Sequence, residues 1–133
     1  MPLINIDVVS GRSPEELRTL LDTVHQAMVQ AFGVPDSDRY QILTEHAPHQ
    51  LVAQDTGLGF HRTEALVFLR FTSRARPEAA KQRLYELLAA RLQTATGLSP
   101  ADLIVSITEN GAADWSFGGG TAQFLTGDLP QPD

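Results

Sequence analysis

The sequence predicts an α+β fold in which a tandem β-α-β duplication forms a four-stranded mixed sheet with two helices on one face. The prediction depends on two amphipathic segments that each begin near a proline and end at a glycine. Pro14 and Gly33 bound the first segment, and Pro77 and Gly97 bound the second. The two starts and the two ends are almost equally far apart along the chain, which indicates an internal repeat.

The first copy begins with residues 3–9, where apolar and polar side chains alternate as in a strand with one buried face. A helix follows, because Ser13 can cap it, Pro14 suits its first turn and Glu16 completes a capping box. After this helix, residues 39–45 are predicted to form the second strand, which completes a β-α-β unit.

The second copy begins with a strand predicted over residues 64–72, which is apolar on both faces and is therefore expected at the centre of the sheet. A helix and a last strand over residues 102–109 complete the unit. The repeat halves are about 2–46 and 64–110. With both helices on one face, the opposite face of the sheet is expected to be apolar, which predicts oligomerisation.

The C-terminal segment 114–129 is predicted to form a short hairpin, because glycines 118–120 are typical of a tight turn. Three of the nine aromatic residues of the chain fall in this segment: Trp115, Phe117 and Phe124. Their rings would either pack on the core or a neighbouring subunit, or form the apolar wall of a site.

The composition is that of an ordinary globular protein, and we expect a single domain over residues 1–133. Sixteen acidic and ten basic residues give a net charge of −6, which argues against nucleic acid or an anionic membrane as partner. The chain has no cysteine, which excludes disulfides and thiolate chemistry. Its start does not resemble a secretory signal and no stretch approaches membrane-spanning length, so we expect a cytoplasmic protein.

The start of the second helix breaks the capping rule of the first. Arg76 stands where the first copy has Ser13; it offers no capping oxygen and places a cation at the positive end of the helix dipole. Arg74 lies two residues earlier, so both guanidiniums project from the same side of an extended chain. They can form a carboxylate site with the helix N-terminus, unless they are ordinary solvated arginines.

Two further residues are candidates for chemistry. Without Met1, Pro2 is a secondary amine; with Met1 in place, its nitrogen is a tertiary amide. We expect Met1 to be removed, because proline is small. Asp38 precedes the second strand, where an aspartate is also typical of a turn. The four histidines show no matching carboxylate pattern, and we expect neither a metal nor a cofactor.

A family resemblance rests on six motifs: Phe32-Gly33-Val34-Pro35, Asp38-Arg39-Tyr40-Gln41, Asp55-Thr56-Gly57-Leu58-Gly59, Ser73-Arg74-Ala75-Arg76, Asp114-Trp115-Ser116-Phe117-Gly118 and Phe124-Leu125-Thr126-Gly127-Asp128-Leu129. Together with Pro2 and the duplicated β-α-β unit, they resemble the tautomerase superfamily, and within it the malonate semialdehyde decarboxylase branch. The resemblance covers nearly the whole chain.

The resemblance implies a homotrimer that decarboxylates a small anionic substrate, a 3-oxo acid such as malonate semialdehyde, without a cofactor. Pro2 would be the catalytic amine and Asp38 would act beside it. Arg74 and Arg76 would act in catalysis by binding and orienting the substrate carboxylate. The apolar wall of the substrate site would consist of Trp115, Phe117, Phe124 and Leu129.

Two alternative functions stay open from the sequence. The first is a cofactor-independent hydratase, dehalogenase or tautomerase that acts on a small unsaturated or 2-oxo acid, since the same amine and arginines can activate water or move a proton. The second is a non-catalytic ligand-binding or signalling trimer with the same fold.

Overall fold

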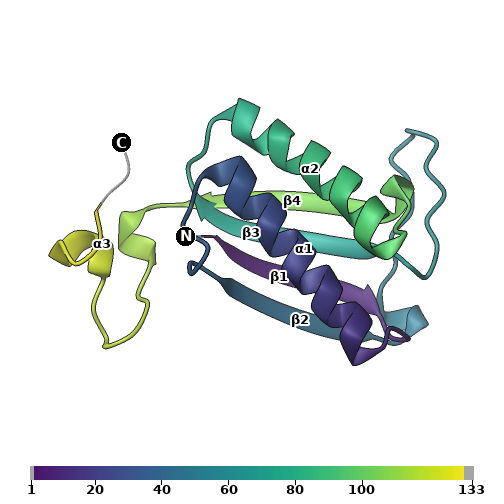
Figure 1. Cartoon of the computed structure of the whole chain (residues 1–133), viewed down its shortest axis with the longest axis horizontal. Helices are drawn as coiled ribbons and strands as arrows, with labels where there is room; N and C mark the ends of the chain where they lie inside the picture. Colours follow the sequence, from purple (N-terminus) through teal and green to yellow (C-terminus); the bar gives the residue numbers. More distant parts are fainter. Residues whose placement is uncertain (1, 131–133) are drawn as a thin grey trace.

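The computed structural model describes residues 2–130, which form one mixed sheet covered by two long helices (Figure 1). The strands and long helices are β1 (Leu3–Val9), α1 (Pro14–Phe32), β2 (Tyr40–His46), β3 (Val67–Arg74), α2 (Glu78–Thr96) and β4 (Leu103–Asn110). The strand order is β2-β1-β3-β4; β1 and β2 are parallel, β1 and β3 antiparallel, and β3 and β4 parallel. The predicted four-stranded mixed sheet with both helices on one face is confirmed.

The first helix begins and ends as its local sequence predicts. Ser13 Oγ accepts a hydrogen bond from the backbone N–H of Glu16 at 3.1 Å, and Glu16 Oε1 accepts one from the N–H of Ser13 at 3.0 Å. Gly33 ends the helix in the left-handed conformation, with φ of 66°, which a residue without Cβ adopts at no steric cost.

The first residue of the second helix is Glu78. Pro77 occupies the N-cap position and offers no side-chain cap. Glu109 of the neighbouring strand partly replaces the cap, because its Oε2 accepts the backbone N–H of Arg76 at 3.1 Å. The same carboxylate pairs with Lys81 Nζ at 3.2 Å. The broken capping rule is therefore offset by a residue from β4.

The third strand begins three residues later than the predicted Glu64. Residues before it are held in a turn, because Thr63 donates its backbone N–H and its hydroxyl to the two carboxylate oxygens of Asp102, at 2.7 and 2.6 Å. The N–H of Leu66 then donates to the Thr63 carbonyl oxygen at 3.1 Å. These bonds replace the strand pairing that the apolar pattern suggested.

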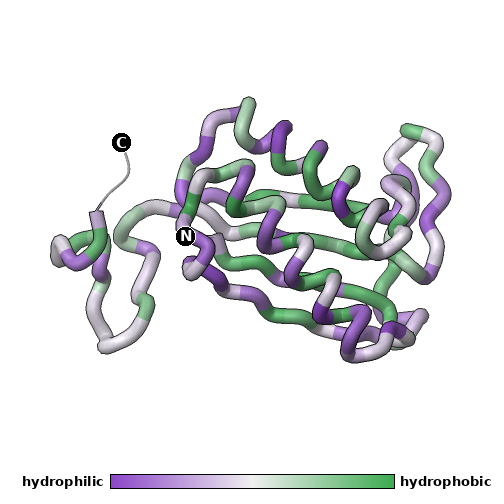
Figure 2. The backbone as a smooth tube through the Cα atoms, viewed as in Figure 1, coloured by the Kyte–Doolittle hydropathy of each residue, from purple (hydrophilic) through white to green (hydrophobic). Residues whose placement is uncertain are grey.

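The hydrophobic core lies between the sheet and the two long helices. Figure 2 shows hydrophobic stretches along the strands and a mixed pattern along both helices, as expected when each helix buries only one side. Fully buried members come from both copies of the unit: Ile4, Ile6, Val8, Leu20, Val24, Met28, Leu69, Phe71, Leu84, Leu88 and Leu92.

The opposite face of the sheet is mixed rather than apolar, which corrects the expectation for that face. Tyr40 and Ile42 are exposed hydrophobic residues there. Beside them, Asp7 accepts a hydrogen bond from Arg70 Nη2 at 2.9 Å and contacts His46 Nε2 at 2.7 Å. The apolar pattern of residues 64–72 predicted a central strand, but it did not indicate that Arg70 lies on this face of the sheet.

The predicted C-terminal hairpin over residues 114–129 is wrong. The segment holds a short 3-10 helix at Ala112–Asp114 and a short helix, α3, at Gln123–Thr126, and between residues 111 and 130 the structure describes no strand. Glycines 118–120 all have positive φ. The Gln123 side chain accepts the N–H of Phe117 at 2.9 Å, which closes a loop instead of a strand ladder.

Candidate functional site

The sheet register brings the start of β1, the start of β2 and the end of β3 to one edge. Leu3 pairs with Tyr40 of β2 and with Thr72 of β3. Pro2, directly before Leu3, is buried at this edge, and Asp38, two residues before Tyr40, is only 9% exposed. Figure 1 shows α3 beyond the same edge, on the side where the N-terminus lies.

Arg74 ends β3 at this edge with one hydrogen-bond donor unused. Its guanidinium carbon lies 4.4 Å from the centre of the Phe124 ring, a cation–π contact. Within residues 2–130, its Nη1 is buried and has no hydrogen-bond partner. A buried donor without a partner is costly, so an oxygen of a bound ligand would stabilise it.

Arg76 is fixed more firmly than Arg74. Its Nε donates to Ser73 Oγ at 3.3 Å and its Nη1 to the Phe32 carbonyl oxygen at 3.4 Å. Burial lowers the pKa of Arg76, the charge of Arg74 lowers it further, and the carboxylate of Asp38 opposes the shift. Arg74 and Asp38 therefore each lie close enough to Arg76 to act on it electrostatically, and the sequence predicts this proximity for the two arginines.

The aromatic residues of the C-terminal segment form one connected group. The rings of Trp115 and Phe117 stack with centres 5.3 Å apart, and Phe117 meets Phe124 edge to face at 5.6 Å. Trp115 Nε1 donates to Asn110 Oδ1 at 2.7 Å, which ties the group to the end of β4. Tyr40 extends the group, with its ring centre 5.5 Å from that of Phe117.

A pocket of about 450 Å³ opens beside this aromatic group. Its lining consists of Pro35, Ser37, Asp38, Tyr40, Phe117, Gln123, Asp128 and Leu129. Three predicted site residues, Asp38, Phe117 and Leu129, are among them. Among the described residues, the lining omits the remaining predicted ones: Pro2, Arg74, Arg76, Trp115 and Phe124. The pocket therefore reaches the sheet edge at Asp38, and neither arginine lines it.

The sequence interpretation missed Tyr40 and Gln123 as members of this pocket. Tyr40 stands in a motif that carries the family resemblance, but nothing in that motif marks it as a pocket residue; it follows Asp38 by two residues and faces the side of the sheet away from the helices. Gln123 carries no sequence signal for a site, because its role depends on the bend that brings Phe117 and Gly118 to its amide.

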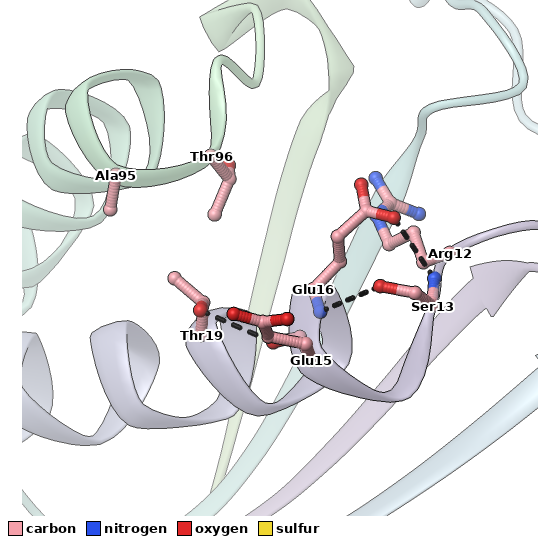
Figure 3. Close-up of a pocket in the computed structure, with 7 residues that line it drawn as sticks. All are labelled: Arg12, Ser13, Glu15, Glu16, Thr19, Ala95 and Thr96. Atoms are coloured by element: carbon pink, nitrogen blue, oxygen red, sulfur yellow. Dashed lines mark hydrogen bonds between the residues drawn. The ribbon is translucent and has the colours of Figure 1, made fainter.

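A second pocket, of about 260 Å³, lies between the start of α1 and the end of α2 (Figure 3). Several of its polar groups are engaged locally. Ser13 and Glu16 form the capping box, and their hydrogen bonds lower the pKa of the Glu16 carboxyl. Arg12 donates to the Ala65 carbonyl oxygen at 2.7 Å. None of the residues that line this pocket is among the predicted site residues.

Neither a membrane span nor a metal cluster is found in the described part of the chain. None of its helices is long and apolar enough to cross a bilayer. Among residues 2–130, there is no group of three or more metal-ligating side chains. Met1, which we expect to be removed, lies outside the described residues.

The chain matches tautomerases along most of its length. A family model described as tautomerase enzyme matches residues 38–118, and a second with the same description matches residues 2–61. The probable tautomerase YrdN of Bacillus subtilis (strain 168) is 54% identical over 129 residues, which cover 97% of this chain and 100% of that protein. The chain belongs to the tautomerase superfamily of enzymes.

Within that superfamily, the chain falls in the malonate semialdehyde decarboxylase branch. A crystal structure of malonate semialdehyde decarboxylase, described with its decarboxylase and hydratase activities, is 50% identical, has a TM-score of 0.93, and is matched over 96% of this chain and 98% of that one. A second malonate semialdehyde decarboxylase, inhibited by 3-bromopropiolate, is 41% identical with a TM-score of 0.93 over 98% and 99%. A fused 4-OT described as an asymmetric trimer is 27% identical with a TM-score of 0.74 over 93% and 98%.

Proposed function

We propose that this enzyme decarboxylates a small 3-oxo acid such as malonate semialdehyde, giving acetaldehyde and carbon dioxide. The observation that carries the proposal is the buried Nη1 of Arg74, which has no hydrogen-bond partner within residues 2–130 and lies beside Arg76, at the edge where Pro2 and Asp38 also lie. The identity of 41% and 50% to two malonate semialdehyde decarboxylases supports the choice of substrate. The proposal includes removal of Met1, which frees the Pro2 amine.

The charges at the edge suggest how the substrate is oriented. Arg74 and Arg76 would bind the substrate carboxylate through charge-assisted hydrogen bonds. Asp38 would repel that carboxylate, so the aldehyde end would be turned toward Asp38 and Pro2. The carbon–carbon bond to be broken would then lie between the cations and the amine.

The Pro2 amine can act in two ways. As a neutral nucleophile it adds to the aldehyde carbon, and loss of water gives an iminium. The bond to the carboxylate then breaks, its electron pair forms the enamine, and carbon dioxide leaves. A proton adds to the enamine carbon and water hydrolyses the iminium, releasing acetaldehyde and the amine. As an ammonium it donates a hydrogen bond to the aldehyde oxygen, and the same bond cleavage gives an enolate, which takes up one proton on carbon to become acetaldehyde.

The aromatic group would assist the loss of carbon dioxide. Arginines bind the substrate carboxylate in the ground state, so on their own they would hold it back. The rings of Trp115, Phe117 and Phe124 form an apolar surface beside Arg74. Such a surface weakens the solvation of a carboxylate and suits the neutral product.

A hydratase activity on a small unsaturated acid is the second candidate. It is favoured because the 50% identical malonate semialdehyde decarboxylase is described with both decarboxylase and hydratase activities. The arginines would bind the carboxylate in the same way, and Pro2 and Asp38 would direct water to the unsaturated carbon. We also propose a homotrimer that covers the mixed sheet face, consistent with the trimer described for the fused 4-OT.

The test is to assay purified protein, shown by intact mass to lack Met1, with malonate semialdehyde and to quantify acetaldehyde and carbon dioxide. Arg74→Ala and Arg76→Ala should each lower kcat/KM by about 100-fold or more. Full activity in both variants would contradict the carboxylate site. An unsaturated three-carbon acid, assayed in parallel, measures the hydratase activity, and borohydride trapping of a Pro2 adduct separates the iminium from the hydrogen-bonding route.

A further inference from the structure

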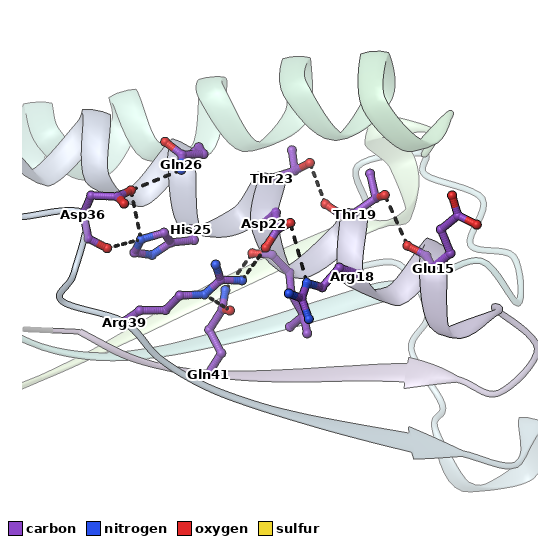
Figure 4. Close-up of polar contacts among 11 residues, drawn as sticks. Glu15, Arg18, Thr19, Asp22, Thr23, His25, Gln26, Asp36, Arg39 and Gln41 are labelled. Atoms are coloured by element: carbon purple, nitrogen blue, oxygen red, sulfur yellow. Dashed lines mark hydrogen bonds and ion pairs between the residues drawn. The ribbon is translucent and has the colours of Figure 1, made fainter.

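The segment Asp36–Arg39, which carries Asp38, is fastened to α1 on both sides of Asp38 (Figure 4). On one side, His25 Nε2 lies 2.7 Å from the Asp36 carbonyl oxygen. On the other, Arg39 Nη2 donates to Asp22 Oδ1 at 2.7 Å. The aspartate assigned to catalysis therefore sits in a short segment whose two ends are held by side chains from another element.

The His25 bond is the buried one of the two. The side chain of His25 is 1% exposed, and a carbonyl oxygen can only accept, so Nε2 carries the proton and donates it. His25 Nδ1 is also buried and, within the described residues, has no hydrogen-bond partner. A histidine in an apolar core is costly unless it makes a needed hydrogen bond, and the one shown here goes to Asp36.

The remaining attachments of the segment are exposed. Gln26 Nε2 donates to Asp36 Oδ1 at 3.2 Å, and the Arg39–Asp22 pair has side chains that are 36% and 50% exposed. Exposed pairs of this kind contribute little, because water competes for both partners and salt screens them. Of these attachments to α1, the buried bond from His25 therefore restrains the segment most.

Asp38 follows the Asp36 carbonyl by two residues and is itself 9% exposed. Its own N–H donates to the Pro35 carbonyl oxygen at 3.0 Å, which makes the segment a tight turn. A shift of the Asp36 carbonyl is therefore passed on to the Asp38 carboxylate. Displacements of about 1 Å at a catalytic group are enough to reduce turnover strongly.

We propose that His25 is a positioning residue for Asp38, and that its buried hydrogen bond to the Asp36 carbonyl oxygen holds the Asp38 carboxylate in place beside the Pro2 amine. The inference rests on the proposed function in one respect, the role given to Asp38 and Pro2. His25 lies in α1, is not among the residues that line the pocket beside Asp38, and acts through the backbone of Asp36.

Two substitutions of His25 separate its hydrogen bond from its bulk. In His25→Gln the amide nitrogen can occupy the position of Nε2 and still donate to Asp36. In His25→Asn the amide is one bond shorter and cannot reach. Leu88→Val, a core change in α2, is the matched control for a loss of stability that leaves the turn untouched.

The first readout is turnover of malonate semialdehyde by protein that lacks Met1. His25→Asn should lower kcat by about tenfold with little change in KM, whereas His25→Gln should rescue kcat because it keeps the hydrogen bond, and Leu88→Val, outside the site, should stay close to the unmodified protein. In an Asp38→Asn background, His25→Asn should cause no further loss, because the group through which it acts is already gone. An equal loss in both backgrounds would overturn the proposal, as would a loss in His25→Gln as large as in His25→Asn.

The second readout needs no substrate. Reductive methylation with formaldehyde and cyanoborohydride, followed by peptide mass spectrometry, gives the pH midpoint at which the Pro2 amine reacts. Lys81, the one lysine of the chain, is the internal reference. A nearby carboxylate favours the ammonium form of Pro2 and so raises the midpoint. Asp38→Asn should therefore lower the midpoint, and His25→Asn should lower it as well. The variant with both substitutions should lower it no further than Asp38→Asn alone.

The two readouts distinguish failure of the inference from failure of the proposed function. A shifted midpoint in a protein that does not decarboxylate malonate semialdehyde supports the role of His25 and removes the proposed substrate. An unshifted midpoint together with unchanged turnover in folded His25→Asn overturns the role of His25 and leaves the decarboxylase in place. If His25→Asn does not fold, His25→Gln provides the test. A folded His25→Gln variant that has lost turnover and whose Pro2 midpoint is lowered overturns the role of His25 equally.

Discussion

The guanidinium carbon of Arg74 lies 4.4 Å from the centre of the Phe124 ring, while Nη1 of the same guanidinium is buried and, within the described residues, unpartnered. A cation–π contact uses the charge of the guanidinium and the face of the ring, and it takes up none of the N–H donors. The contact therefore fixes the orientation of Arg74 and leaves a donor for a carboxylate oxygen.

Replacing Phe124 by leucine should weaken substrate binding. The change removes the cation–π contact but keeps an apolar side chain, so we expect KM to rise by about five- to tenfold with a smaller effect on kcat. Steady-state kinetics with the substrate measure this. Phe60→Leu is the matched control, because Arg62 lies 5.0 Å from the Phe60 ring away from the pocket lined by Asp38. Equal changes in KM for both variants would contradict the prediction.

A lysine at position 74 should not substitute for Arg74 in binding the substrate carboxylate. A lysine keeps the charge but lacks the planar fork of donors, and its ammonium would stack less well on Phe124. We expect kcat/KM for Arg74→Lys to fall by about tenfold or more. Arg83→Lys, an exposed position on α2, makes the same chemical change away from the edge and should leave kcat/KM unchanged. Unchanged kinetics in Arg74→Lys would show that charge alone is sufficient.

Removing the cap of α1 should lower stability without lowering activity. Ser13→Ala deletes the hydroxyl that accepts the Glu16 N–H and should cost about 1 kcal/mol of unfolding free energy. Urea unfolding followed by circular dichroism measures the loss. Ser13→Asp, which restores a capping oxygen, should recover most of it. A drop in kcat/KM under conditions where Ser13→Ala is folded would argue that this end of α1 is coupled to the site.

The stabilising effect of Glu109 should depend on pH in the acid range. The hydrogen bond from Lys81, and after it the Arg76 N–H, holds the pKa of the Glu109 carboxyl below its ordinary value of 4.5. Its contribution is therefore complete above that ordinary value and is lost as the pH falls through the lowered pKa. The difference in Tm between the unmodified protein and Glu109→Gln should be present at pH 7 and shrink below about pH 4.5.

Glu86→Gln is the control for this pH dependence, because it removes the same charge from an exposed position on α2. Its Tm should follow that of the unmodified protein more closely at every pH. A Tm difference for Glu109→Gln that grows as the pH falls would have the wrong sign and would contradict the assigned hydrogen bonds.

The helices could be predicted closely because their ends are encoded locally. Ser13 and Gly33 lie within a residue of the helix they bound, and their effect needs only the neighbouring backbone. The predicted strand bounds agree less well with the structure where a distant residue intervenes. The strand predicted from residue 64 begins at Val67, because Asp102 binds Thr63. Glycines 118–120 carry the local signal of a tight turn, but whether the flanking segments pair depends on the contact of Gln123 with Phe117.

By itself, the sequence determined the duplicated β-α-β unit, the ends of α1, the mixed sheet and the pair Arg74 and Arg76 at the broken cap. The tertiary structure alone decided that Arg74 rests on Phe124 and that His25 holds the carbonyl of Asp36. The physical reason is the distance along the chain over which each kind of interaction acts. Caps and periodic patterns act within a few residues, whereas these contacts join elements whose relative position is set by strand register and core packing, for which no short stretch of sequence carries a signal.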